Sequence, residues 1–377
     1  MRRLAAGAML LAGCPGPEPA APAFPGDWLP PEGFWAYSGP ERLIVAEDDG
    51  VYDAGAYGVY DPGAGAWVAE GGVAHGDALV ACAGPWLVVI NRMFGDNLQF
   101  VDPEDGATVG QYSVGNGANP AAVVFWGQRA FVSLYEADHL AVLRWDTGAQ
   151  VGAVDLSPWA DADGLPEASQ LFVHGGLVWV TLQRLSREAA WWESHLEGVL
   201  LGIDPEALEV AVEIPLGVNN PTGRWSLVGD LARVAAVGGY FTDASQQQIL
   251  LDGGLLEADL AAATARPLGL TEQVAGANVY DAVTDGVTAW LSADTGWGDE
   301  ASYQAWSVDE PALLGTLFSG YTPAWAWEDE EVPADGVWVA RRNEYALELR
   351  AWPGGELVSS VDTALQPSAI ERCRPGR

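Results

Sequence analysis

The sequence predicts an all-β protein: a seven-bladed β-propeller in which each blade is a four-stranded antiparallel sheet. Three observations lead to this prediction: a motif that recurs along the chain, the spacing of its copies, and incomplete copies at the two ends. The motif is a short apolar strand, an Asp-Pro or Asp-Gly turn and a second short strand. Its clear copies are YDPGAGAWV at 60–68, VDPEDGATV at 101–109, WDTGAQV at 145–151 and IDPEALEV at 203–210.

Weaker copies of the motif follow at 258–268, 308–317 and 351–361. The turn positions, separated by 41, 44, 58, 55, 50 and 43 residues, are Asp61, Asp102, Asp146, Asp204, Asp259, Asp309 and Trp352. A period of about 40–50 residues made of short strands is typical of a propeller with one sheet per repeat. Seven copies therefore predict seven blades.

A second repeat precedes the turn motif and supplies the other two strands of a blade. Its second strand (FVSL, VWVT, AWLS or VWVA) is β-branched or aromatic at alternate positions. Copies lie at 118–134, 165–183, 279–294 and 322–342. Each blade is thus expected to run as strand a, strand b, strand c into the turn, and strand d after it.

The two ends of the chain predict how the ring closes. The segment QPSAIERC at 366–373 matches strand a alone, whereas the first blade begins at strand b, at 41–48. The C-terminal strand is therefore expected to pair into the N-terminal blade, which removes two open sheet edges.

The cysteines fit this closure. Cys82 ends a strand a in the second blade, and Cys373 ends the strand expected in the first, so the repeat alignment places them at similar heights on neighbouring strands. We expect them to form a disulfide if the protein is exported. The alternative is two buried thiols.

The N-terminus has the pattern of an export signal. Residues 1–13 carry two Arg and then a short apolar stretch, and LAGC ending at Cys14 resembles a bacterial lipobox, which predicts lipidation of Cys14. The alternative is an ordinary signal peptide with a chance Cys. Residues 14–31 are expected to form a Pro-rich tether and residues 32–377 the propeller. In many Gram-negative bacteria an Asp directly after the lipidated Cys retains the protein at the inner membrane. Here that residue is Pro15, which favours the outer membrane of a Gram-negative bacterium.

The composition limits the partners. The chain has 52 acidic residues against 17 basic ones, all of them Arg, and a formal net charge of −35. Such a surface repels nucleic acid and anionic lipid. The charge serves solubility or attracts a cationic ligand. Without Lys, no Schiff base can form.

Loops on one face are the candidate binding site, because b–c and d–a connections share a face when strands alternate in direction. Arg92, Arg184 and Arg342 begin three of the b–c loops and could bind a carboxylate or phosphate. Alternatively, each pairs with a neighbouring acid. Trp191 and Trp192 in the insertion 184–198, and Tyr240 in the insertion 238–254, could hold a flat ligand or simply cover the sheet.

The d–a loop SPWADADGLPEA is a candidate calcium site. Asp161, Asp163 and Glu167 around Gly164 resemble half of a calcium loop, although the full EF-hand spacing is not met. A bound calcium would be structural. The alternative is a plain turn.

The strand-b motifs, the DPEDGATV-type turns and Asn119-Pro120 resemble the YVTN-type bacterial β-propellers (YncE-like) over about 35–373. With the lipobox, the resemblance implies a lipid-anchored envelope protein that binds a small molecule or a partner such as an outer-membrane transporter. Related propellers also imply two alternatives: an enzyme (a lactonase-like hydrolase or a quinoprotein dehydrogenase) or a structural or adhesive scaffold. Linear catalytic motifs such as G-x-S-x-G and H-E-x-x-H are absent from the sequence, which favours binding.

Overall fold

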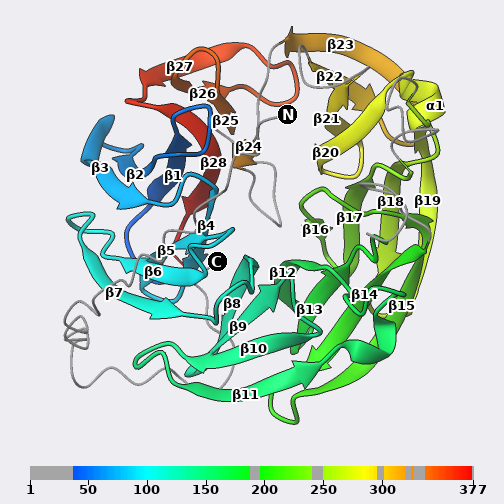
Figure 1. Cartoon of the computed structure of the whole chain (residues 1–377). Helices are drawn as coiled ribbons and strands as arrows, with labels where there is room; N and C mark the ends of the chain where they lie inside the picture. Colours follow the sequence, from blue (N-terminus) through cyan, green and yellow to red (C-terminus); the bar gives the residue numbers. More distant parts are fainter. Residues whose placement is uncertain are drawn as a thin grey trace, which may run out of the picture.

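The computed structural model describes residues 37–186, 196–239, 249–294, 301–319, 324–326 (backbone alone) and 336–375. Seven four-stranded antiparallel sheets form a ring (Figure 1). The predicted seven-bladed propeller is therefore confirmed. No helix in these ranges is long and apolar enough to cross a membrane.

The blades follow the chain in order, with strand a innermost and strand d outermost (Figure 1). Blade 1 contains β28 (Gln366–Cys373), β1 (Arg42–Asp48), β2 (Gly55–Asp61) and β3 (Ala66–Ala74); blade 2 β4 (Ala78–Ala83), β5 (Trp86–Asn91), β6 (Asn97–Val101) and β7 (Thr108–Ser113); blade 3 β8 (Pro120–Trp126), β9 (Arg129–Leu134), β10 (His139–Arg144) and β11 (Gln150–Asp155); blade 4 β12 (Ala168–His174), β13 (Leu177–Leu182), β14 (Glu197–Asp204) and β15 (Glu209–Asn219). Blade 5 contains β16 (Ser226–Val228), β17 (Leu231–Ala236), β18 (Gly254–Asp259) and β19 (Thr264–Thr271); blade 6 β20 (Asn278–Thr284), β21 (Thr288–Asp294), β22 (Ser302–Ser307) and β23 (Ala312–Ser319); blade 7 β24 (Ala324–Ala326), β25 (Val337–Arg341), β26 (Ala346–Arg350) and β27 (Leu357–Asp362). A short α1 (Glu272–Ala275) links blades 5 and 6, and a single 3-10 turn (Ser157–Trp159) precedes blade 4.

The Asp turns join strands c and d, as the motif predicts. The Asp61 carboxylate accepts a hydrogen bond from the Ala64 amide (2.8 Å), which is the local bonding that makes Asp a turn residue. Four residues after the Asp, the backbone is left-handed: φ is 65° at Gly65 and 70° at Gly106. Leu208 and Ala263 occupy the same left-handed position in blades 4 and 5, so the turn keeps its conformation where glycine is replaced.

The c–d turns of blades 2 and 3 also pack against the blade before them. The Tyr57 hydroxyl of β2 donates to the Gly106 carbonyl in the turn of blade 2 (3.0 Å), and Tyr112 of β7 donates to the Asp146 carbonyl in the turn of blade 3 (3.1 Å). A Cβ on Gly148 would lie 2.1 Å from the Tyr112 ring, so only glycine fits there. The turn glycines thus allow neighbouring blades to approach closely.

The ring closes as predicted. β28 pairs antiparallel with β1, from Arg42 opposite Cys373 to Asp48 opposite Gln366. The Cys82–Cys373 disulfide is also confirmed, with a Cα–Cα distance of 5.6 Å. Because Cys82 belongs to β4, the bond joins blade 1 to blade 2.

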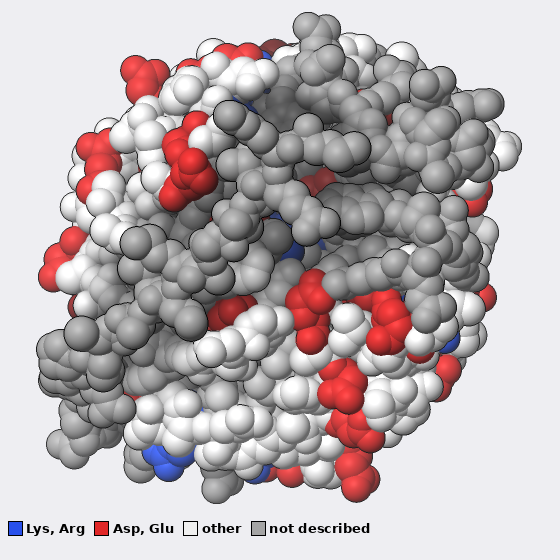
Figure 2. All heavy atoms as spheres, viewed as in Figure 1, with Lys and Arg blue, Asp and Glu red and all other residues white. Residues whose placement is uncertain are grey.

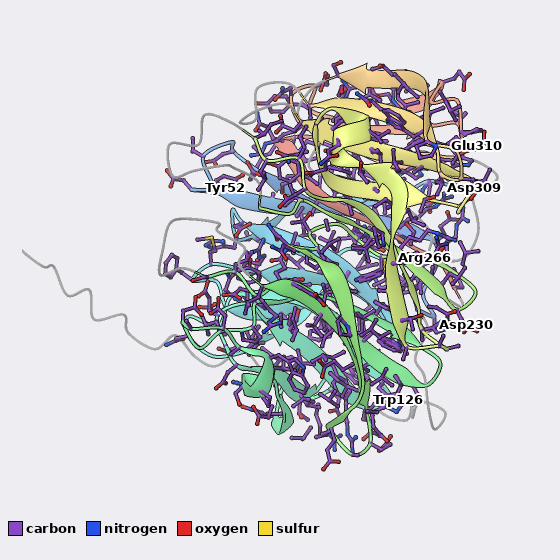
Figure 3. The ribbon with its side chains drawn as sticks, turned by 90° about the vertical axis from the view of Figure 1, so that its right-hand side faces the viewer. Tyr52, Trp126, Asp230, Arg266, Asp309 and Glu310 are labelled. Carbon is purple, nitrogen blue, oxygen red and sulfur yellow. A yellow bond between two sulfur atoms is a disulfide. The ribbon has the colours of Figure 1, made fainter. Side chains whose placement is uncertain are left out.

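The two faces of the ring differ in which connections they carry. The b–c and d–a connections form the upper face, viewed in Figure 1, and the a–b and c–d turns form the lower face. In the side view of Figure 3, Tyr52 of a b–c loop lies at one face, whereas Asp230 and Asp309 of an a–b and a c–d turn lie toward the other. The first described residues start from the lower face, because the Ser38 amide bonds to the carbonyl of Gly84 in an a–b turn (2.9 Å).

Removing the disulfide should lower stability markedly. The bond closes a loop with a sequence separation of 291 residues, and losing such a bond typically costs about 2–5 kcal/mol. A Cys82→Ala, Cys373→Ala double variant should therefore unfold at a lower urea concentration than the oxidised protein. The reduced wild type is the matched control and should resemble the variant. Equal midpoints for all three samples would contradict a stabilising role for the bond.

Candidate functional site

The centre of the ring is bridged by an ion pair between opposite blades. Arg224, two residues before β16 in blade 5, pairs through its guanidinium with Glu371 of β28 in blade 1. A second guanidinium nitrogen donates to the Ile370 carbonyl (3.3 Å), and the Arg224 amide donates to the Asp281 carboxylate (3.1 Å). Figure 2 shows basic atoms at the middle of the upper face, with acidic atoms around them. The interaction joins inner strands that lie across the ring from each other.

The three predicted arginines lie at matching positions on the upper face, and each contacts its own surroundings. Arg92 is 3.5 Å from the Asp77 carboxylate, and Arg184 donates to the carbonyls of Trp159 (2.9 Å) and Glu197 (3.2 Å). In the described part of the chain, each of the three guanidiniums bonds to its own set of neighbours. The arrangement is the one expected if they hold loops, and ligand binding by them stays a prediction.

Arg342 is the most deeply embedded of the three. It donates to the buried Asp48 carboxylate (2.5 Å) and to the Gln366 side chain (3.0 Å), and its guanidinium lies 5.4 Å from the centre of the Tyr52 ring. These partners belong to blade 1, whereas Arg342 belongs to blade 7. Arg342 therefore links blades 7 and 1 at the seam where the ring closes.

The remaining predicted aromatic residues, Trp191, Trp192 and Tyr240, lie outside the described residues. Their contribution to a site stays a prediction from the sequence.

The predicted calcium loop is bonded to its own backbone. The Asp161 carboxylate accepts from the Asp163 amide (2.9 Å), Asp163 accepts from the Leu165 amide (2.9 Å), and buried Glu167 accepts from the Leu185 amide (2.9 Å). Burial raises the pKa of Asp161, which disfavours its charged form. Nowhere in the described ranges do three or more His, Cys, Asp or Glu side chains group to hold a metal. Calcium binding by this loop stays a prediction.

Polar side chains have a recurring role on this face that the sequence did not indicate. Buried acceptors in d–a connections bind backbone amides of b–c loops: Asn119 accepts from Met93 (3.3 Å), Glu167 from Leu185, and Glu272 from Gly253 (3.0 Å). Such a residue has no spacing signal, because the connections differ in length. The bonds fix the bases of the upper-face loops.

Glu272 makes further hydrogen bonds. Its buried carboxylate also accepts from the Val279 amide (2.8 Å) and the Asn278 side chain (3.1 Å). Burial raises the pKa of Glu272 to about 7, and the nearby Asp252 adds to the shift.

A second feature that the sequence did not indicate is a set of exposed aromatic residues with left-handed backbone. Tyr345 (φ 53°), Tyr52 (φ 63°) and Phe94 (φ 73°) lie on the b–c loops of blades 7, 1 and 2, which are neighbours in the ring. They are 44%, 50% and 88% exposed. We call these three residues the aromatic arc. Neither motif predicts it, because loop conformation is not part of the repeat.

The arc is held from below. The Phe94 loop is fixed by Asp96, whose carboxylate accepts from the amides of Gly117 (2.7 Å) and Asn119 (2.8 Å). On the other side, the Gln366 side chain bonds both to Arg342 and to the Tyr345 hydroxyl (3.4 Å). The aromatic residues are thus attached to a rigid base.

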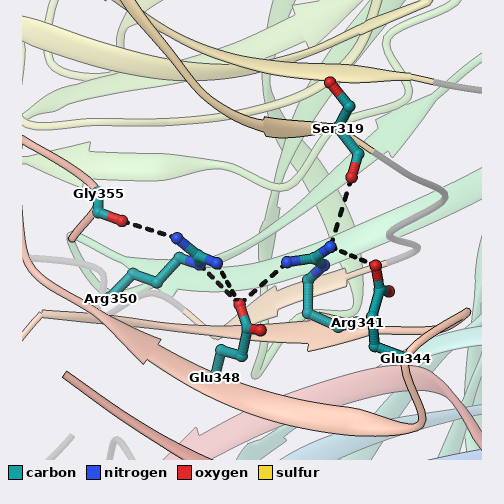
Figure 4. Close-up of polar contacts among 6 residues, drawn as sticks. All are labelled: Ser319, Arg341, Glu344, Glu348, Arg350 and Gly355. Atoms are coloured by element: carbon teal, nitrogen blue, oxygen red, sulfur yellow. Dashed lines mark hydrogen bonds and ion pairs between the residues drawn. The ribbon is translucent and has the colours of Figure 1, made fainter. Parts of the chain in front are cut away.

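Blade 7 supports its loop with a charged cluster (Figure 4). Arg341 and Arg350 both bind the Glu348 carboxylate, and Arg341 also binds Glu344 in the loop (2.5 Å). Both guanidiniums lie 4.7 Å from the centre of the Phe318 ring in blade 6. These charges are used for packing between blades.

Comparisons with known proteins support the propeller fold alone. No family model matches the chain, and no curated protein matches it in sequence. Among solved structures, it is similar to a Bacteroides fragilis protein provisionally assigned as a 6-phosphogluconolactonase (TM-score 0.56, 11% identity, 89% of this chain and 98% of that one). It is also similar to Kuenenia stuttgartiensis hydrazine synthase (0.52, 12%, 76% and 86%) and to apo AztD from Citrobacter koseri (0.50, 12%, 88% and 97%).

Replacing the seam arginine should cost far more than replacing its counterpart in blade 2. Arg342→Ala leaves the fully buried Asp48 charge without its cation, which typically costs about 3–5 kcal/mol. Arg92→Ala removes a pair at 3.5 Å whose two side chains are each 24% exposed, and it should cost less than about 1 kcal/mol. Urea unfolding of both variants measures the difference. Equal losses in the free energy of unfolding would show that Arg342 does not stabilise the seam.

Stability should depend on pH through Glu272. Its folded pKa of about 7 lies above its ordinary value of 4.5, so its favourable contribution is complete below pH 4.5 and is lost as the pH rises to about 7. The Glu272→Gln side chain does not titrate. Relative to the wild type, the free energy of unfolding of this variant should therefore rise by up to about 3 kcal/mol between pH 5 and 8. The difference is measured by urea unfolding at each pH. A difference that does not change with pH would contradict the assignment.

Proposed function

We propose that the protein is a lipid-anchored, non-enzymatic propeller of the cell envelope that binds a small molecule or a partner protein on its upper face. The aromatic arc carries the proposal. Phe94 is almost fully exposed, so it contributes little to the core, yet its backbone has a conformation that costs a non-glycine residue about 1 kcal/mol or more. Folding alone would favour glycine at this position.

The chemistry of the arc suits recognition. Aromatic side chains offer a large contact area at low cost in conformational entropy, and they dominate the energetics of many interfaces. Val51 and Met93, 67% and 48% exposed, lie directly beside Tyr52 and Phe94 and extend the apolar surface. Exposed Asp49 and Asp53 flank Tyr52 and add a negative rim.

The lipobox and the aromatic arc together favour a receptor-like binding role. A lipid on Cys14 would anchor the protein, and the exposed side chains of the arc would contact the ligand or partner.

Phe94→Gly should separate binding from folding. Glycine accepts a φ of 73° without strain, so the free energy of unfolding should change by less than about 1 kcal/mol or rise slightly. Affinity should fall tenfold or more, because an exposed anchor has been removed. The matched control is Val287→Gly, which removes an exposed residue (66%) from an a–b turn of the lower face and should leave affinity unchanged.

The ligand for this measurement comes from a thermal-shift screen against cobalamins, siderophores, haem, pyrroloquinoline quinone, sugars and calcium. A ligand that prefers the folded protein raises the melting temperature. A hit whose affinity is equal for the wild type and Phe94→Gly would contradict binding at the arc.

The anchor is tested separately. Cells that express the full chain should incorporate radiolabelled palmitate into the wild type and not into Cys14→Ser, and the variant should be released from the membrane fraction. Equal labelling of both proteins would contradict lipidation at Cys14.

A further inference from the structure

The loops that carry the aromatic arc are joined to one another. The Tyr52 loop of blade 1 packs against the connection into blade 2, because a Cβ on Gly76 would lie 2.3 Å from the Tyr52 carbonyl oxygen. The amide of the neighbouring His75 donates to the side chain of Asn91 (2.7 Å), which is the last residue of β5 and lies three residues before Phe94. The loops of Tyr52 and Phe94 are therefore linked through this one connection.

The link to blade 7 runs through the seam. Arg342 lies against the Tyr52 ring and shares the Gln366 side chain with Tyr345. All three aromatic residues thus belong to one stretch of the upper face, over blades 7, 1 and 2. Further exposed apolar side chains in this stretch are Val51, Met93 and, at the upper end of β3, Val73.

Two exposed carboxylates lie in the central loop of this stretch. Asp49 and Asp53 flank Tyr52 in blade 1, which stands between blades 7 and 2. The Asp49 carboxylate accepts from the amides of Val51 (3.1 Å) and Asp53 (3.2 Å). These donors are neutral, so they fix the position of the carboxylate without cancelling its charge.

The arginines beside the arc are already paired with acids of the protein itself, Arg342 with Asp48 and Arg92 with Asp77. The field at the arc is therefore set by the exposed acids and by the net charge of −35. Aromatic rings in a negative field attract cations, and a guanidinium stacks well on an aromatic face. The protein makes this contact internally, where Arg342 lies 5.4 Å from the centre of the Tyr52 ring.

The dimensions of the arc favour an extended ligand. Packed sheets lie about 10 Å apart, so loops on blades 7 and 2, on either side of blade 1, are separated by about 20 Å. A small cation contacts one loop. An extended chain that advances about 3.3 Å per residue reaches all three loops with about six residues.

We propose that the aromatic arc binds an extended, arginine-containing segment of a partner protein, laid across blades 7, 1 and 2. The inference rests on the proposed function, since it names the partner of the same site. Guanidiniums of the segment stack on Phe94 and pair with Asp49 and Asp53, while its apolar side chains pack against Tyr52 and Tyr345. The negative charge of the chain also speeds the capture of such a segment.

Fluorescence anisotropy with labelled octapeptides and the full chain tests the proposal. The probe, two copies of Arg-Arg-Leu-Leu in sequence, places both residue types on each side of an extended chain. It should bind at a single site, about tenfold more tightly than the same peptide with Gln in place of Arg, because exposed ion pairs each contribute modestly. A peptide with Glu in place of Arg should not bind. The dipeptide Arg-Leu should compete about 100-fold more weakly than the probe, because it reaches one loop.

Matched variants locate the binding. Asp49→Asn with Asp53→Asn removes two charges, keeps the oxygens that accept from loop amides, and should weaken binding of the probe about tenfold. The control, Glu104→Gln with Asp105→Asn, removes two exposed charges from the lower-face turn of blade 2 and should leave affinity unchanged. Phe94→Gly should weaken binding about tenfold. Melting temperatures verify that the variants are folded.

Four results would each overturn the basic segment as the partner: a probe that does not bind, equal binding of the Gln peptide, equal effects of the two double variants, or equal competition by the dipeptide. The proposed function fails separately. A ligand from the thermal-shift screen that loses affinity in Phe94→Gly would keep the arc as a binding site even where the probe does not bind. If neither the probe nor any screened ligand depends on Phe94, the arc is not the site and both proposals are wrong.

Discussion

The pairing of β28 with β1 is the contact on which the rest of the ring depends. It brings the last described strand to the first one and makes a closed ring from seven sheets that would otherwise end in two open edges. β28 is tied in other directions as well: Cys373 to Cys82 of blade 2, Glu371 to Arg224 of blade 5, and Gln366 to Arg342 of blade 7. One strand thus connects four blades.

This closure also bears on the upper face. Gln366, the first residue of β28, contacts both Arg342 and Tyr345, and Arg342 in turn lies against Tyr52. Two of the three residues of the aromatic arc therefore flank the seam. A strained loop persists only where its surroundings determine it, and here the closing strand provides those surroundings. Stability of the ring and display of the arc are consequences of the same contacts.

The sequence predicted those features that depend on periodicity. The Asp turns gave the number of blades, and the unmatched strand at 366–373 gave the closure and the partner of Cys82. It did not predict the arc or the buried acceptor Glu272, because left-handed loop conformations and burial depend on neighbouring blades. The matched arginines could be predicted because all b–c loops share one face of the ring. Their partners are set by tertiary contacts that no local pattern contains; Asp48, for example, is separated from Arg342 by 294 residues in the sequence.

Native-state hydrogen exchange, read by mass spectrometry, tests the role of the closing strand most directly. If the ring depends on it, the amides of β28 and β1 should exchange only in global unfolding, as slowly as the amides of the central blades. The protection of both strands should then fall together with overall stability when urea is added. Faster exchange of β28 and β1, while the other six blades remain protected, would show that the ring stands without its closure and would contradict the account.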